Sequence, residues 1–167
     1  MLFICGSRAY PGEGVADHHK GWIVGLAYRQ SLQRPTAADE ARQPAFEIEK
    51  SLDRASPALY HAVHFGRVFS KVIVEVCRGT DQAERFLTIE MSDAVIAQVR
   101  QAAASSSGRS RPVETVVFEY RRIQWTYTKL RQPDASREGN TSSAWTRAMV
   151  GSGSRPRTRA DGRSTAP

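Results

Sequence analysis

Short runs of apolar, aromatic and β-branched residues alternate along the chain with segments rich in Gly, Pro, Ser and Asp. This pattern predicts short β-strands joined by turns, because neighbouring side chains of a strand point to opposite faces. Residues 45–50 show it most clearly, since Phe46 and Ile48 alternate with Glu47 and Glu49. Further strands are expected at residues 2–7, 21–32, 70–79, 85–99 and 113–128.

The two longest of these strands also indicate which residues share a face. In residues 85–99 almost every second residue is apolar, which predicts a long strand with a single packed face. Its apolar positions are Leu87, Ile89, Met91, Val95, Ala97 and Val99. In residues 113–128 the apolar residues occupy one face in the first half and the opposite face in the second. A phase slip at Arg121–Arg122 requires a β-bulge or a sharp bend, as at the corner of a barrel.

Residues 56–65 break the β pattern and predict one short helix. Ser56 suits the N-cap position, Pro57 suits the first turn, and Gly66 suits a left-handed stop. An apolar stripe at helical spacing is formed by Leu59, Ala62 and Val63.

Together these elements predict an all-β fold, mainly β with one short helix. Two antiparallel sheets are expected to form a β-barrel-like domain with the helix on one flank. This domain is assigned to residues 1–130, because apolar periodicity stops at about Leu130. Residues 131–150 are assigned to a C-terminal extension. Whether this extension forms a terminal hairpin is left as an alternative. Residues 151–167 are basic and of low complexity, and we expect them to be disordered.

The net charge of +7 is concentrated near the C-terminus. Residues 1–128 hold 16 Lys and Arg against 14 Asp and Glu, whereas residues 129–167 hold 8 against 3. A charged groove for nucleic acid on the folded domain is therefore not implied. An alternative remains a small barrel of the OB type that binds single strands through Arg109, Arg111, Arg121, Arg122, Trp125 and Tyr127. Trp22 and Trp125 are more simply explained as core or interface aromatics.

The sequence contains no apolar run near the roughly 20 residues that span a bilayer, so we expect no membrane insertion. The first residues, MLFICGSR, lack the order of charge and apolar region of a secretory signal peptide. Cys5 and Cys77 are the two cysteines, and without an export signal we expect reduced thiols.

No motif predicts catalysis, a cofactor or a metal site, so we expect the protein not to be an enzyme. Four glutamates alternate with apolar residues, which is typical of the solvent face of a strand: Glu47, Glu49, Glu75 and Glu90. His18 and His19 fall in a loop, and His61 and His64 on the helix lack further ligands nearby. Neither a G-x-S-x-G elbow nor a phosphate loop is present.

Several motifs occur in a characteristic order: PGEG (11–14), HKGWI (19–23), LAYRQS (26–31), AFEIEKSLDRASPALYHAVHFGR (45–67), IVEVCRG (73–79), RPVETVVFEYRRIQWTY (111–127) and GNTSSAW (139–145). In order and spacing they resemble the haemolysin-coregulated protein (Hcp) family. Arg121 stands where that family commonly has Gly, so the bend there must form without glycine's freedom at positive φ.

The resemblance implies an Hcp-like fold and a structural role in the tube of type VI secretion. Subunits of that family form hexameric rings, which stack into a tube that can hold small effector proteins and contacts spike and sheath proteins. The resemblance also implies assembly in the cytoplasm, followed by secretion without a signal peptide. A phage-type tail tube subunit, which has a related fold, stays open as an alternative.

Two regions are candidates for contacts within such a tube. The resemblance places Arg29 at a position that faces the channel, with Tyr28 packed on the opposite side of the strand. It also implies that the segment from Gln33 to Pro44 projects along the tube axis, where it would contact the next ring. Its stiff ends and mixed charges fit such a contact, and the candidate residues are Arg34, Pro35, Asp39, Glu40, Arg42 and Pro44.

Overall fold

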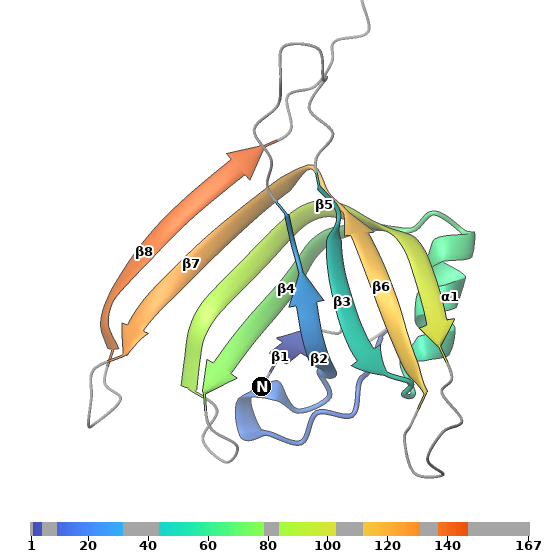
Figure 1. Cartoon of the computed structure of the whole chain (residues 1–167), viewed down its shortest axis with the longest axis horizontal. Coiled ribbons are helices and arrows are strands. Elements are labelled where there is room, and N and C mark those ends of the chain that lie inside the picture. Colours follow the sequence, from blue (N-terminus) through green and yellow to red (C-terminus); the bar gives the residue numbers. More distant parts are fainter. Residues whose placement is uncertain are drawn as a thin grey trace, which may run out of the picture.

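The computed structural model describes residues 2–4, 10–31, 44–78, 84–102, 112–130 and 137–146. Within these ranges, eight strands accompany one α-helix and one 3-10 turn (Figure 1). In chain order the elements are β1 Leu2–Ile4, η1 Asp17–His19, β2 Ile23–Arg29, β3 Phe46–Ser51, α1 Ser56–His64, β4 Val68–Arg78, β5 Glu84–Ala102, β6 Val113–Glu119, β7 Arg122–Leu130 and β8 Arg137–Thr146. The expected tail at 151–167 lies outside the described residues.

All strands belong to one antiparallel sheet of order β4-β1-β2-β3-β6-β5-β7-β8. A further pairing between β4 and β5 leads the hydrogen-bonding path back to β4, which makes the arrangement barrel-like. Strands β7 and β8 extend this sheet on one side, while α1 lies on the opposite flank (Figure 1). The predicted mainly β fold with one flanking helix is confirmed. The strands assigned to two sheets form one, because the 19 residues of β5 pair with β7 in their first half and with β6 in their second.

The core lies between the faces of this curved sheet. Phe46 and Ile48 are fully buried, whereas Glu47 and Glu49 on the alternate positions remain partly exposed, as their spacing predicted. The other large side chains that are almost fully buried are apolar residues of β4, β5, β6 and β7, together with two charged groups: Val74, Ile89, Met91, Val116, Ile123, Lys50 and Glu114.

The expected bend in the last long strand is confirmed. Strand β6 ends at Glu119 and β7 begins at Arg122, and the buried side chains of Tyr120 and Ile123 flank the break. The backbone N–H of Arg121 donates to the carbonyl of Ser92 over 3.1 Å, so β5 holds the corner.

The residue with an unusual backbone conformation at this corner lies on β5. Asp93 has a φ of 49° and is the only described non-glycine residue with positive φ. The carboxylate of Asp93 lies 4.0 Å from the guanidinium of Arg121. The bend therefore forms without a glycine at 121, because the strained position is on the neighbouring strand.

The expected single packed face of residues 85–99 is wrong in its second half. Ile89 and Met91 are buried as predicted, but beyond Asp93 the buried residues are Ala94 and Ile96, and Ala97 is exposed. The reason is the positive φ of Asp93, which coincides with the point where β5 leaves β7 and joins β6. The face that meets the core changes there.

Helix α1 has the expected extent, with Leu59 and Ala62 buried and Gly66 at a φ of 58° after its end. The prediction of Ser56 as N-cap is wrong, because Ala55 occupies that position and Ser56 is the first helical residue. Its hydroxyl is instead buried and bonded to Glu114 and to the N–H of Asp53. Among the described residues, no helix has the length and apolar character that crossing a membrane requires.

Candidate functional site

The candidate residue Arg29 lies at the end of β2 on an exposed sheet face. Its side chain is 73% exposed, and its guanidinium lies 3.7 Å from the carboxylate of Glu49 on β3. Tyr28 points to the other face, where its ring stacks on the buried ring of Phe46 at 5.6 Å between centroids. Arg29 is thus available to solvent while its strand is anchored from the opposite side.

A second ion pair continues this exposed face. Arg100 of β5 lies 3.3 Å from Glu47 of β3, across the intervening strand β6. Two arginines, from β2 and β5, therefore lie on either side of the two glutamates of β3. Exposed pairs of this kind add about 0–1 kcal/mol each to stability. The charges of the two arginines and two glutamates cancel, so this face is polar but not basic. We refer to Arg29, Glu47, Glu49 and Arg100 as the mixed-charge face.

Most of the candidate stacking segment lies outside the described residues, including Arg34, Pro35, Asp39, Glu40 and Arg42. The chain is described up to Ser31, just before this segment, and again from Pro44, its last residue. The hydroxyl of Tyr120 donates to the carbonyl of Pro44 over 3.0 Å and accepts from the side-chain amide of Gln30 over 3.1 Å. The carbonyl oxygen of Gln30 in turn accepts from the indole N–H of Trp125 over 3.1 Å. Burial raises the pKa of Tyr120, so its hydroxyl stays protonated and can keep both hydrogen bonds, to Pro44 and to Gln30.

The far edge of the sheet carries exposed aromatic side chains. Strand β8 pairs with β7 and has no second neighbour among the described strands. Tyr127 on β7 and Trp145 on β8 are 51% and 37% exposed. An unpaired edge with nearby aromatics favours association with another chain, because its backbone N–H and C=O groups lack partners.

Two of the residues named for a nucleic-acid platform, Arg121 and Trp125, have partners within the subunit. Arg121 faces Asp93, and Trp125 packs against the core with its N–H bonded to Gln30. Trp125 therefore does not present an open ring for base stacking. Arg109 and Arg111 lie outside the described residues.

The loop that precedes β2 is folded tightly onto itself. The N–H of Gly12 donates to the carbonyl of Gly21, and the N–H of Gly14 donates to that of Trp22, both over 2.8 Å. A Cβ atom on Gly12 would lie 2.2 Å from the Trp22 carbonyl oxygen, so only glycine fits this approach. The PGEG segment thereby fixes the position of His19.

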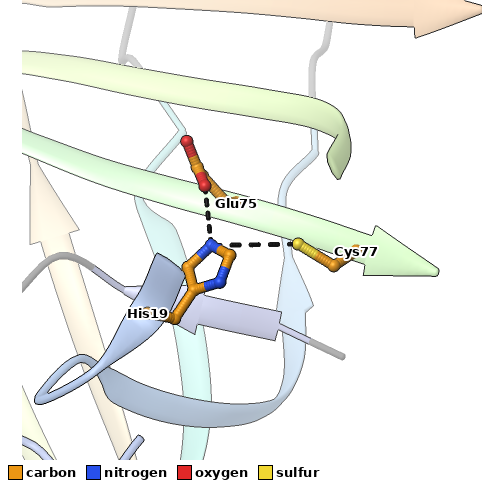
Figure 2. A group of neighbouring side chains, drawn as sticks. All are labelled: His19, Glu75 and Cys77. Carbon is orange, nitrogen blue, oxygen red and sulfur yellow. Dashed lines mark hydrogen bonds and ion pairs between the residues drawn. The ribbon is translucent and has the colours of Figure 1, made fainter. Parts of the chain in front are cut away.

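His19, Glu75 and Cys77 meet beneath this loop (Figure 2). The Nε2 atom of His19 lies 2.7 Å from a carboxylate oxygen of Glu75 and 3.9 Å from the sulfur of Cys77. All three side chains are buried. The expectation that Glu75 lies on a solvent face is wrong, because the loop covers that face of β4. Burial and the nearby Glu75 carboxylate raise the pKa of the Cys77 thiol.

Sequence reasoning missed this cluster, although one signal was present. Glu75 and Cys77 are two residues apart on a strand and therefore share a face. The histidine comes from a segment 56 residues earlier, and spacing along the chain does not indicate where that loop packs. Cys5, the other cysteine, lies outside the described residues.

A second buried polar cluster is centred on Lys50. Its ammonium donates to Glu114 over 2.6 Å and to Asp53 over 2.8 Å. It also lies 3.2 Å from the Ser56 hydroxyl, which donates to the same oxygen of Glu114. Lys50 and Glu114 are fully buried, so this cluster joins β3, β6 and the start of α1 from inside the protein. The remaining histidines of the helix, His61 and His64, are exposed.

Comparisons with known proteins identify the fold and the family. Residues 4–127 match the family described as "Type VI secretion system effector, Hcp". A type six secretion system protein of known structure superposes with a TM-score of 0.74 at 21% identity, over 87% of this chain and 94% of that one. A type VI secretion system effector from Yersinia pestis gives 0.70 at 23% identity over 87% and 99%. Hcp1 from Salmonella typhimurium gives 0.70 at 19% identity over 87% and 92%. No curated protein sequence matches the chain.

Proposed function

This chain belongs to the Hcp family of type VI secretion proteins, and we propose that it is a structural tube subunit without enzymatic activity. In this proposal, six copies form a ring and the rings stack into a tube. The observation that carries the proposal is the family match over residues 4–127, together with an Hcp-like fold in the described residues. The predicted family membership is thereby confirmed.

The surface of the subunit supports assembly into a ring. The unpaired edge of β8 and the exposed Tyr127 and Trp145 lie on one side of the sheet. A ring in which each subunit offers two different faces closes when the rotation between neighbours fits, and it covers such edges. Association through this edge would therefore bury aromatic surface that is costly to leave in water.

The wider proposal follows the same family. Tubes would assemble in the cytoplasm against spike and sheath proteins and would then be secreted without a signal peptide. Small effector proteins would travel in the channel. Nucleic acid is not a partner in this proposal, and the near neutrality of the mixed-charge face supports that view.

We expect the purified full chain to sediment at about six times its 18.5 kDa mass and to form rings in negative-stain electron micrographs. Sedimentation velocity across micromolar concentrations measures the mass, and image averages measure the symmetry. A single 18.5 kDa species at every concentration would contradict the proposal.

Arg29 is proposed to face the channel and contact cargo. Its 73% exposed side chain and the anchored strand beneath support this role. The Arg29→Ala variant should keep ring formation and lose retention of a co-expressed effector in pull-down experiments. Lys71→Ala, which also removes one exposed, ion-paired cation, is the matched control. Unchanged effector retention in Arg29→Ala would remove Arg29 from the contact.

The segment from Gln33 to Pro44 is proposed to join stacked rings. Gln30, shortly before the segment, and Pro44, its last residue, both bond to the hydroxyl of Tyr120, which supports a loop that starts and ends at one anchored place. Replacement of residues 36–42 by a short Gly/Ser linker should leave rings intact and abolish tubes in electron micrographs. Stacking by wild-type rings should also weaken with salt, because exposed charge pairs contribute about 0–1 kcal/mol each. Normal tubes from the linker variant would refute this contact.

A further inference from the structure

The buried cluster of His19, Glu75 and Cys77 gathers three different metal-binding groups at one point. An imidazole nitrogen, a carboxylate oxygen and a thiol sulfur all lie within 4.8 Å of one another. The three residues are 2%, 8% and 3% exposed, so they are not an incidental group of surface residues. Figure 2 shows them converging from the loop before β2 and from β4.

The separations suit a small tetrahedral ion. Zinc bonds of about 2.0–2.3 Å place neighbouring ligand atoms roughly 3.3–3.6 Å apart. The distance from Nε2 of His19 to the Cys77 sulfur is 3.9 Å, close to that range. The distance from the same nitrogen to the Glu75 oxygen is 2.7 Å, so this oxygen needs to move by only about 0.6 Å.

The surroundings hold the ligands in place from outside. Arg85 donates to the other oxygen of Glu75 over 2.6 Å, which fixes the carboxylate and leaves the oxygen near His19 for an ion. The His19 ring packs edge-on against Trp22 at 4.8 Å between centroids. Its backbone N–H donates to Ala16, and its carbonyl accepts from the N–H of Trp22. Ligands on a constrained loop and a central strand lose little freedom when an ion binds.

The donor set indicates which ion would bind. Calcium and magnesium prefer sites made of oxygen alone, whereas a thiolate and an imidazole select zinc and its neighbours among the transition metals. We propose that His19, Glu75 and Cys77 bind one zinc ion per chain. Binding would release the Cys77 thiol proton to solvent, and the proton between Nε2 of His19 and Glu75 would move to Nδ1, so that the neutral imidazole ligates through Nε2. The carboxylate and the thiolate would then balance the two charges of the ion. With three protein ligands, a tetrahedral zinc ion would take a water molecule as its fourth ligand.

A zinc ion here would tie the loop before β2 to β4. It would act as a structural clasp, because its ligands are buried and come from both segments that it would join. This inference does not depend on the proposed tube function, since it concerns the inside of one subunit.

The test uses the full chain, stripped with a chelator and titrated with Zn²⁺ against a chromophoric competitor. One equivalent should bind, and Co²⁺ used in its place should show a thiolate-to-cobalt charge-transfer band. The Cys77→Ser variant should lose this band. It should also lose more Zn²⁺ affinity than the about 10–100-fold expected from loss of an outer-shell partner.

Control variants separate this site from ordinary surface binding. His18→Gln changes the neighbouring exposed histidine and should bind Zn²⁺ as the wild type does. His19→Gln should lose binding, and circular dichroism shows whether it remains folded. If it unfolds, Cys77→Ser decides alone, because that change replaces one sulfur by oxygen. Failure of the wild type to bind one equivalent, or equal binding by Cys77→Ser, would overturn the proposal.

Discussion

Replacing Lys50 by Ala is expected to lower the free energy of unfolding by about 3–5 kcal/mol. The ammonium of Lys50 is fully buried and donates to Glu114, which is also fully buried. Removal of the ammonium leaves a carboxylate inside the protein without its cation. The Ser56 hydroxyl still donates to one oxygen of Glu114, while the other oxygen has no hydrogen-bond partner among the described residues, so no positive charge replaces the lost ammonium. Urea unfolding at a fixed protein concentration measures the change.

Two further variants show whether the unpaired charge is the cause. Lys71→Ala removes a lysine that is 52% exposed and paired with Glu90 over 2.9 Å, so it should cost about 0–1 kcal/mol. The double variant Lys50→Met with Glu114→Leu removes the two fully buried charges and should recover most of the stability lost by Lys50→Ala. Asp53 keeps the hydrogen bond that it accepts from the N–H of Ala55. If the double variant is less stable than Lys50→Ala, the loss comes from packing and not from the unpaired carboxylate.

The sequence alone was sufficient to predict those buried positions and element ends that depend only on neighbouring residues. Phe46 and Ile48 alternate with glutamates and are buried as expected. The change of parity before Ile123 located the bend, and Gly66 located the end of the helix. In each case the information lies within a few neighbouring residues, because strand alternation and left-handed stops are local properties.

Burial that depends on distant segments could not be predicted in the same way. Glu75 alternates with apolar residues as a solvent-facing glutamate would, yet the loop carrying His19 covers it. The second half of β5 changes its packed face because Asp93 adopts a positive φ where the strand exchanges neighbours. The burial of Lys50 could have been predicted from the sequence. Lys50 is two residues after Ile48 and four after Phe46, so its side chain points to the same, core-facing side of the strand.

Replacing Phe46 by Ala is expected to cost about 3–5 kcal/mol, because a fully buried aromatic side chain is removed from the centre of the sheet. Phe46 lies on β3, between β2 and β6, and supports the ring of Tyr28 from beneath. Loss of its volume leaves a cavity that the strands can close only by shifting. A native domain has about 5–15 kcal/mol of stability, so this single change removes a large share.

The matched control is Phe65→Ala, since Phe65 follows the helix and is 66% exposed. Its loss should change the free energy of unfolding by no more than about 0.5 kcal/mol. Thermal and urea unfolding of both variants, at one concentration, measure the difference. Phe46→Ala should also yield fewer rings in electron micrographs, because a smaller share of the chains is folded. Equal stability of the two variants would mean that the core is centred elsewhere than on Phe46.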